Sequence, residues 1–290
     1  MYTNYLDLEE ENGKKIYVWP VPYEGTVSFD TGTRHGPQAI LQASYEIETW
    51  DEEVGKDIAD FAHFQTLPFF RPPVTGPEEV LKQMKDFLQD FDPENDFLLT
   101  LGGEHSLASA PASFYQQAYP DLVVLQLDAH ADLRSSFQDS PYSHACVMSR
   151  IRDLGLPLLQ MGIRSLSQKE SEYIKAQPQD ELLTFFSWEL PSPEEAADKA
   201  LDFIGNRPLY ISFDADGLDP ALLPGTGTPE PGGLEYRWLN KFWACLFPGP
   251  KLVGMDYCEL APRPAAGVVS ESVAVRCINK ILLHFLSSHA

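Results

Sequence analysis

The 290-residue sequence has few cysteines, and their positions exclude two kinds of small stabilised domain. The four thiols lie far apart and form no C-x-x-C pair; they are Cys146, Cys245, Cys258 and Cys277. Closely spaced cysteines are the signature of zinc knuckles and of disulfide frameworks, so neither is indicated. We therefore expect the cysteines to be reduced and to have a structural role.

Basic residues are also scarce. The sequence has 21 lysines and arginines against 43 aspartates and glutamates, which gives a net charge of -22. Nucleic acids and anionic membranes would be repelled by this charge, so we expect neither as a partner. A small cationic substrate would be attracted.

Long apolar runs are absent: no segment approaches the roughly 18 residues of a membrane span. Residues 1–15 are polar and acidic, unlike a secretory signal, so we expect a cytoplasmic protein. The sequence shows no low-complexity tract and no repeat of fixed period. Its length and its 43% hydrophobic content predict one domain over residues 1–290, with a polar N-terminal segment at 1–14.

What the sequence does contain is a set of apolar segments that end in acids and histidines. Residues 122–127 form an apolar run typical of a strand that is buried on both faces, and Asp128, His130 and Asp132 follow it directly. Side chains two residues apart in an extended chain point the same way, so these three are expected to aim at one point.

Two further segments repeat this pattern. Residues 208–213 run into Asp214 and Asp216, and residues 96–101 run through two glycines to His105. Ligands of open parallel sheets bind outside the carboxyl ends of the strands, so we expect these side chains to meet there. The candidate metal ligands are His105, Asp128, His130, Asp132, Asp214 and Asp216.

Predicted strands alternate with predicted helices along the whole chain. The expected strands are 15–22, 96–101, 122–127, 158–164, 182–186, 208–213 and 251–256. The expected helices are 37–43, 76–91, 107–119, 144–151, 166–176, 193–204, 234–247 and 270–285. This alternation predicts an α/β fold, a three-layer α/β/α sandwich with a central, mostly parallel sheet. The Gly- and Pro-rich segment 224–233 is expected to be an ordered loop near the candidate ligands.

The residue types of this cluster indicate a pair of divalent ions. Four carboxylates and two imidazoles suit Mn²⁺, and Fe²⁺, Co²⁺, Ni²⁺ or Zn²⁺ remain open. Four negative charges packed together would repel one another unless about four positive charges lay among them, and two divalent ions provide these. Two ions roughly 3.5 to 4 Å apart would share a hydroxide, so hydrolysis is the expected reaction.

Three motifs carry a resemblance to a known family. They are GGEHS at 102–106, DAHAD at 128–132 and SFDADGLDP at 212–220, and with them the sequence resembles the ureohydrolases, the arginase and agmatinase family, from about residue 21 to residue 286. The resemblance implies an arginase-like sandwich, two Mn²⁺ ions that activate a bridging water, and a homo-oligomer, either a trimer or a hexamer.

The same resemblance implies a role for each candidate residue. One ion would be bound by His105, Asp128, Asp132 and Asp214, and the other by Asp128, His130, Asp214 and Asp216. Hydroxide would attack the guanidinium carbon of the substrate, and the tetrahedral intermediate would collapse to urea and an amine. Asp132 would orient the hydroxide, His144 would shuttle protons, and Glu259 would pair with the guanidinium group.

The substrate branch is less constrained than the family. The segment 226–233 and the spacing from Asp132 to His144 look more like agmatinases than arginases, and the loop 133–143 lacks the asparagine with which arginases hold the amino acid end of arginine. We therefore predict conversion of agmatine to putrescine and urea, a step of polyamine biosynthesis. Arg134 keeps a guanidino acid open, as in a guanidinobutyrase or guanidinopropionase, and arginase activity is a further alternative.

Three other classes fit the sequence less well. A dinuclear phosphoesterase needs more histidines, and we place His63, His284 and His289 in helical or terminal contexts, with His35 as a loop residue. A zinc deacetylase of related fold would carry adjacent histidines, and the sequence has no His-His pair. A non-catalytic metal-binding relative would be expected to have lost ligands, whereas all six positions are filled.

Overall fold

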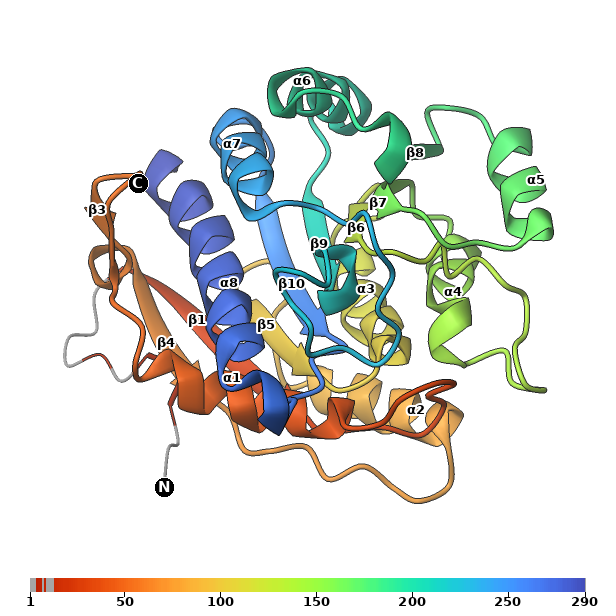
Figure 1. Ribbon diagram of the computed structural model, residues 1–290, viewed down its shortest axis with the longest axis horizontal. Helices are drawn as coiled ribbons and strands as arrows, with labels where there is room; N and C mark the ends of the chain where they lie inside the picture. The colour runs from red at the N-terminus through yellow and green to blue at the C-terminus, as the bar shows by residue number, and fades with distance from the viewer. Residues whose placement is uncertain (1–3, 7, 9–12, 290) are drawn as a thin grey trace.

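The computed structural model describes residues 4–6, 8 and 13–289, and its centre is a sheet of eight strands (Figure 1). The strand order is β4-β1-β5-β10-β9-β6-β7-β8, and each pairing between these neighbours is parallel. The strands are β1 (Lys14–Val21), β4 (Ala62–Thr66), β5 (Phe97–Gly102), β6 (Val123–Leu127), β7 (Leu158–Ile163), β8 (Leu182–Phe186), β9 (Leu209–Asp214) and β10 (Leu252–Cys258). A short antiparallel pair, β2 (Trp50–Asp51) and β3 (Lys56–Asp57), lies outside this sheet.

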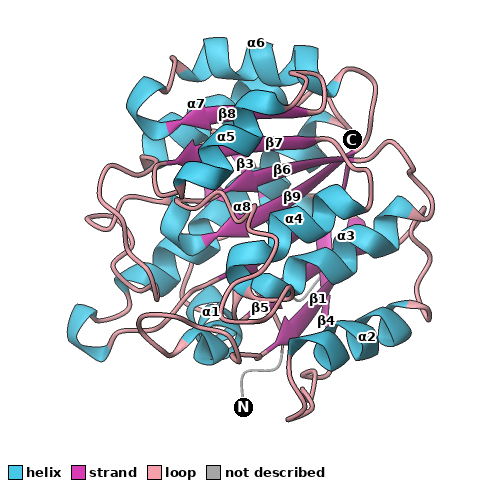
Figure 2. Cartoon of the chain, turned by 90° about the vertical axis from the view of Figure 1, so that its right-hand side faces the viewer, coloured by secondary structure: helices cyan, strands magenta, loops and turns pink. Residues whose placement is uncertain are grey.

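Helices cover both faces of the sheet (Figure 2). One face carries α1 (Gly36–Ser44), α6 (Pro193–Ile204), α7 (Tyr236–Leu246) and α8 (Val269–Ser288). The other carries α2 (Pro77–Leu88), α3 (Ser109–Gln116), α4 (Val147–Asp153) and α5 (Gln168–Ala176). The predicted three-layer α/β/α sandwich is thus confirmed.

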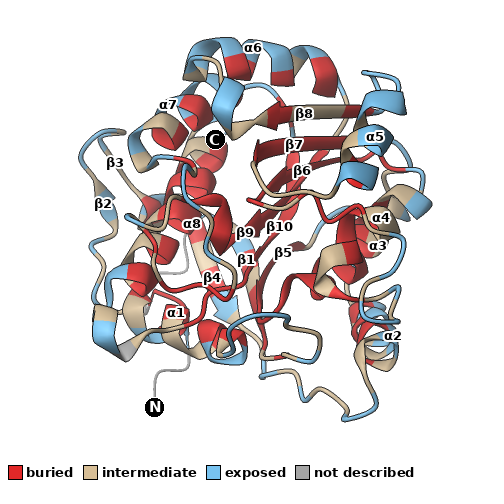
Figure 3. Cartoon of the chain, turned by 45° about the vertical axis from the view of Figure 1, so that its right-hand side comes forward, coloured by how far each residue is buried: buried red, intermediate tan, exposed pale blue. Residues whose placement is uncertain are grey.

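The central strands are apolar at consecutive positions because both faces of the sheet are covered. In β6, Leu125 packs into the core on the side of α8, whereas its neighbour Val124 packs into the core on the side of α3. All five residues of β6 are buried, as Figure 3 shows for the middle of the sheet. Alternating side chains therefore join one strand to two separate hydrophobic cores.

The order of the strands brings four strand ends together. β5, β10, β9 and β6 are consecutive neighbours in the middle of the sheet, although β5 and β6 are separated from β9 and β10 by about 80 residues or more of chain. Because the strands are parallel, the segments that follow all four leave the sheet at the same edge. The motifs singled out in the sequence all lie in those segments.

Two features of the N-terminal part differ from the expectation. The strand β4 was not predicted, and the assignment of His63 to a helical or terminal context was wrong because this residue lies within β4. Tyr5 and Leu6, in the predicted polar segment, are buried, and the Tyr5 hydroxyl donates to Asn279 Oδ1 at 2.8 Å. Residues 1–3, 7 and 9–12 of that segment lie outside the described residues.

The structure also places the four cysteines and His35, which the sequence analysis considered. Cys146, Cys258 and Cys277 are buried and Cys245 is exposed, and all four are unpaired. His35 is exposed and lies in the turn before α1. Among the helices of the described residues, none is long and apolar enough to cross a membrane.

Candidate active site

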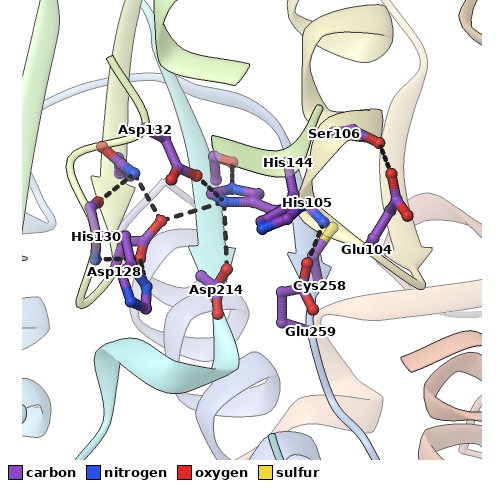
Figure 4. A network of polar contacts seen from close by, with 12 residues as sticks. Glu104, His105, Ser106, Asp128, His130, Asp132, His144, Asp214, Cys258 and Glu259 are labelled. Carbon is purple, nitrogen blue, oxygen red and sulfur yellow. Dashed lines mark hydrogen bonds and ion pairs between the residues drawn. The ribbon is translucent and has the colours of Figure 1, made fainter. Parts of the chain in front are cut away.

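The structure brings the six predicted ligands together at the carboxyl edge of the sheet, and Figure 4 labels all of them except Asp216. His105 begins the turn after β5, Asp214 is the last residue of β9, and Asp128 follows β6. All of them except His130 are at most 4% exposed; the six are His105, Asp128, His130, Asp132, Asp214 and Asp216.

The first group of ligand atoms surrounds the Nδ1 atom of His105. The carboxylate oxygens of Asp128, Asp132 and Asp214 lie 3.1, 3.2 and 3.3 Å from it. One imidazole nitrogen can donate only one hydrogen bond, so hydrogen bonding to His105 does not account for three oxygens at this distance. Oxygen and nitrogen donors that converge in this way fit a bound cation.

The second group surrounds the Nδ1 atom of His130. Asp216 Oδ2 lies 3.1 Å from this nitrogen and Asp128 Oδ1 lies 3.6 Å from it. Asp128 therefore faces His105 with one oxygen and His130 with the other. The residues present fit two ions that share a carboxylate ligand.

The raised pKa values of two aspartates in the cluster also fit a bound cation. Burial and the negative charge of Asp128 raise the pKa of Asp132 to about 7. Burial and the charges of Asp216 and Asp128 raise the pKa of Asp214 well above its usual value. The protein alone does not supply enough positive charge for these carboxylates, which is the situation that metal cations relieve.

Hydrogen bonds at Nε2, the ring nitrogen that does not face the carboxylates, fix the orientation of His105. Its Nε2 atom lies 2.9 Å from Ser212 Oγ, and the Ser212 hydroxyl donates to Asp256 Oδ1 at 3.1 Å. The Tyr210 hydroxyl donates to the other oxygen of Asp256 at 2.7 Å. Since the serine proton is used on Asp256, Ser212 accepts from His105 Nε2–H, which leaves Nδ1 unprotonated toward the carboxylates.

Backbone amides and neighbouring loops hold the aspartates. Asp128 Oδ1 accepts from the backbone N–H of His130 at 2.6 Å, and Asp216 Oδ1 accepts from that of Ala129 at 3.1 Å. The Thr228 hydroxyl donates to Asp216 Oδ2 at 2.9 Å. This contact confirms that the 224–233 loop is ordered beside the candidate ligands.

Arg164 stabilises the same corner, and its role was not predicted. Its guanidinium donates to the backbone carbonyls of Asp216, Gly217 and Leu218 and also to Glu230 in the 224–233 loop. The side chain thus joins the turn that carries Asp216 to the loop that carries Thr228. Its position directly after β7 is the only sign of this role in the sequence.

His144 lies at a cavity of about 220 Å³ beside the cluster. The cavity is lined by the candidate ligands His130 and Asp132, by the buried Glu170, and by Arg134 and Phe137 among other residues. Burial and the neighbouring His130 lower the pKa of His144 to about 4. The imidazole is therefore neutral at pH 7 and able to accept a proton.

Glu259 directly follows β10, the strand that pairs with β5. Its Oε1 atom accepts from the backbone N–H of His105 at 2.6 Å, so it adjoins the cluster, but it is not among the residues that line the cavity. Glu259 and Asp132 have positive φ angles, 62° and 53°. Non-glycine residues rarely adopt this backbone conformation, which tends to occur at functional sites.

Side chains that the sequence did not reveal complete the surroundings of His144. Thr26 Oγ1 lies 3.1 Å from its Nδ1, and Ser28 Oγ lies 3.3 Å from its Nε2. Both belong to the loop between β1 and α1, which Glu104 holds in place. A pattern in the sequence does not report contacts between residues more than 100 positions apart.

The fold and the site together define an α/β protein whose histidines and aspartates at the carboxyl edge of the sheet could bind metal. The chain belongs to the arginase family, whose sequence model matches residues 14–284. It is a hydrolase of the C–N bonds of linear amidines and, within that class, a guanidino ureohydrolase.

Individual relatives support this assignment. The chain is 34% identical over 273 residues to an N(1)-aminopropylagmatine ureohydrolase of Synechocystis sp., covering 92% of this chain and 88% of that protein. It is 29% identical over 253 residues to an agmatinase of Bacillus cereus, covering 86% and 84%. The solved structure of proclavaminate amidino hydrolase from Streptomyces clavuligerus matches with a TM-score of 0.85 at 26% identity, over 99% of this chain and 98% of that one.

Proposed function

We propose that this protein converts agmatine to putrescine and urea with two Mn²⁺ ions. The observation that carries the proposal is the position of Asp128, whose two oxygens face His105 and His130 at 3.1 and 3.6 Å. A carboxylate shared between two groups of ligands is suited to a pair of ions a short distance apart. Carboxylate oxygens and imidazole nitrogens are ligands that Mn²⁺ accepts.

The contacts around each histidine support the two groups of ligands that the family resemblance implies. One ion would be held by His105, Asp128, Asp132 and Asp214. The other would be held by Asp128, His130 and Asp216, with Asp214 as a further ligand on the basis of the resemblance alone. When bound, the ions supply Lewis acidity that lowers the pKa of a water molecule toward neutrality.

Three side chains complete the reaction in this proposal. Asp132 faces both His105 and the cavity, so its carboxylate can accept a hydrogen bond from the attacking water and orient it. In this proposal Glu259 pairs with the guanidinium N–H groups through Oε2, the oxygen that the backbone of His105 does not use. His144 is neutral, and it takes up a proton and delivers it to the nitrogen of the departing amine.

A second substrate is favoured by a specific observation. Identity is higher to an N(1)-aminopropylagmatine ureohydrolase, 34%, than to an agmatinase, 29%. Agmatine and its aminopropyl derivative share the guanidinobutyl part, so the same cluster would act on both. The difference lies beyond the leaving nitrogen, where the cavity opens toward Arg134 and Phe137.

The test is urea release by Mn²⁺-loaded protein. Agmatine, N(1)-aminopropylagmatine, arginine, 4-guanidinobutyrate, 3-guanidinopropionate and guanidine are compared under one set of conditions. We expect the highest kcat/KM with agmatine; a higher value with its aminopropyl derivative would move the assignment to the second candidate. No urea from any of them, from protein that holds two ions, would contradict the proposal.

The assembly and the compartment remain predictions. We propose a homo-oligomer, a trimer or a hexamer, on the basis of the family resemblance alone, and a cytoplasmic location, as expected from the sequence. Light scattering on the eluted peak of a gel-filtration column checks the first part, since a monomer at micromolar concentration would contradict it. Localisation of the tagged full-length chain checks the second.

A further inference from the structure

Glu104 is a fully buried carboxylate that the proposed reaction does not use. Its Oε2 atom accepts from the backbone N–H groups of Gly25 and Thr26, and its Oε1 atom accepts from the hydroxyls of Thr26, at 2.7 Å, and Ser106, at 2.5 Å. Four donors thus converge on one side chain. The loop comes this close because residue 103 is glycine: a Cβ atom there would lie 2.0 Å from the carbonyl oxygen of Tyr23.

The hydrogen bond from Thr26 to Glu104 determines how the Thr26 hydroxyl can bond to His144. A hydroxyl has one proton to donate and two lone pairs that accept. The proton is used on Glu104, and the lone pairs face the backbone N–H of His144 at 3.0 Å and its Nδ1 at 3.1 Å. Thr26 can therefore only accept from Nδ1, which requires the proton of the neutral imidazole to be on that atom.

Two other hydroxyls contact the ring and do not change this result. Ser143 Oγ lies 3.3 Å from Nδ1, farther than Thr26, and a serine hydroxyl can accept from Nδ1–H as well as donate. Ser28 Oγ lies 3.3 Å from Nε2 and can donate to the lone pair that this tautomer leaves there. Both contacts are compatible with a proton on Nδ1.

We propose that Glu104 and Thr26 are positioning residues that fix His144 as the Nδ1–H tautomer. The lone pair of Nε2 then lies on the side of Ser28, a residue that lines the cavity, and this atom takes up a proton from solvent and delivers it to the departing amine. In that step the N–H bond on Nε2 breaks, the carbon–nitrogen bond of the tetrahedral intermediate breaks, and the amine leaves with the proton. The catalytic part of this inference rests on the proposed function of His144; the tautomer does not.

The opposite arrangement at His105 supports the mechanism. There the Ser212 hydroxyl is committed to Asp256 and accepts from Nε2–H, so Nδ1 is the free atom. Each histidine is thus fixed by a hydroxyl whose proton is used on a buried carboxylate. The unprotonated nitrogen faces the metal ligands in one case, and in the other it lies beside Ser28, which lines the cavity.

The direct test is the protonation state of the two ring nitrogens. Long-range ¹H–¹⁵N spectra of protein labelled with ¹⁵N-histidine and loaded with diamagnetic Zn²⁺ distinguish the two tautomers, and His144→Gln assigns the signal. We expect Nδ1–H in the unsubstituted protein. An Nε2–H pattern would overturn the inference, whatever the enzyme does with any substrate.

Glu104→Gln gives a sharper test because it reverses the hydrogen bond between Thr26 and residue 104. We call the chain of hydrogen bonds from His144 through Thr26 to Glu104 the relay. Backbone N–H groups always donate, so the amide oxygen must take the place of Oε2 and the NH₂ group must take the place of Oε1. Thr26 then accepts from the amide and its proton becomes free for Nδ1. We expect the tautomer of His144 to shift to Nε2–H; an unchanged Nδ1–H signal in folded protein would contradict the relay.

Thr26→Val removes the hydroxyl with little change in volume. We expect kcat of the Mn²⁺-loaded enzyme to fall by about 10- to 100-fold with KM and metal content nearly unchanged, since outer partners of an active histidine have effects of this size. Thr26→Ser should restore most of the rate, and Thr31→Val, at an exposed threonine of the same loop, should leave it unchanged.

The outcomes separate this inference from the proposed function. If Thr26→Val keeps the kcat of the unsubstituted enzyme, or if Thr26→Ser is as slow as Thr26→Val, the relay does not serve catalysis. If His144→Ala retains full turnover, the proposed role of His144 fails, while the spectra still decide the tautomer.

Discussion

The inner wall and the mouth of the site are built in different ways. The inner wall, behind the residues that line the cavity, consists of His105, Asp128, Asp214 and Asp216, which lie at or shortly after the ends of central strands and are at most 3% exposed. The mouth consists of Ser28, Arg134 and Phe137, which come from the β1–α1 loop and the 133–143 loop. Of these, the Arg134 side chain is 40% exposed.

The difference suggests a division of labour. Side chains at strand ends are held by the sheet and by backbone N–H groups, so their positions vary little, as metal binding demands. Side chains on loops rest on local contacts, and loops are where substrate selection is commonly built. Substitutions in the inner wall should therefore remove the reaction, and those at the mouth should change which substrate is preferred.

Asp128→Asn should have the largest effect. The substitution removes the charge that is shared between the two ligand groups, so we expect loss of bound Mn²⁺ and turnover no higher than background. Metal analysis and urea release measure both. Asp121→Asn, at an exposed position in the turn before β6, is the matched control and should behave as the unsubstituted protein. Full turnover by the Asp128 variant would refute the shared-ligand assignment.

His144→Ala should come next. General acid–base groups contribute about 10²- to 10⁴-fold, so we expect turnover to fall by that factor. Metal content should stay the same, because His144 belongs to neither group of ligand atoms. Metal loss in this variant would mean that the residue is a ligand and that its role has been misassigned.

These two residues also show how far the sequence predicts the site. The ligands of the inner wall were predictable because spacing of two residues fixes direction in a strand, and parallel strands end at one edge. The contacts of His144 were not predictable, because Thr26 lies 118 positions away in the sequence and only folding brings the two loops together. For the same reason the sequence does not predict that Ser212 and Asp256 orient His105. Asp256 is recognisable only as an acid in a predicted strand.

In the fold, too, features that depend on neighbouring residues were predicted from the sequence, and features that depend on distant contacts were not. Seven of the eight strands were predicted from apolar runs that both faces of the sheet require. The edge strand β4 was not predicted because its residues, AHFQT, include the polar His63 and Gln65 and form no apolar run. Tyr5 was assigned to a polar segment by its neighbours in sequence, whereas its burial follows from contacts with Phe64 and Asn279.

Ser212→Ala should weaken metal binding without removing a ligand. Loss of the hydroxyl frees the ring of His105 to turn, and changes of this kind cost about 10- to 100-fold in metal affinity. Titration of metal-free protein with Mn²⁺ measures the effect. Tyr210→Phe also removes a hydrogen bond to Asp256 but leaves the contact between Ser212 and His105, so its effect should be smaller. Equal effects of the two variants would contradict the orienting role of Ser212.

Metal affinity should rise with pH. Although burial lowers it, the charges of Asp216 and Asp128 raise the pKa of His130 to about 12, and the pKa of Asp132 is about 7 in the absence of metal. Below these values the ligands carry protons that an ion must displace, so binding weakens as pH falls and strengthens as it rises. Each released proton changes the affinity by about tenfold per pH unit. Calorimetry in two buffers of different ionisation enthalpy counts these protons; a count of zero at pH 7 would contradict the pKa assignments.

The smallest effect is expected at Arg134, in the mouth. Its guanidinium lies 5.2 Å from the centre of the Phe137 ring, and its Nε lies 3.6 Å from Glu170 Oε2. The neighbouring carboxylate offsets much of the positive charge, and the site is partly exposed, so repulsion of a cationic substrate tail is weak. We expect Arg134→Met to raise kcat/KM for agmatine by about two- to fivefold and to lower it for 4-guanidinobutyrate, whose carboxylate Arg134 attracts. The ratio of the two values is the measurement. An unchanged ratio would mean that Arg134 supports the loop without selecting the substrate, and a large loss of both activities would place it with the inner wall.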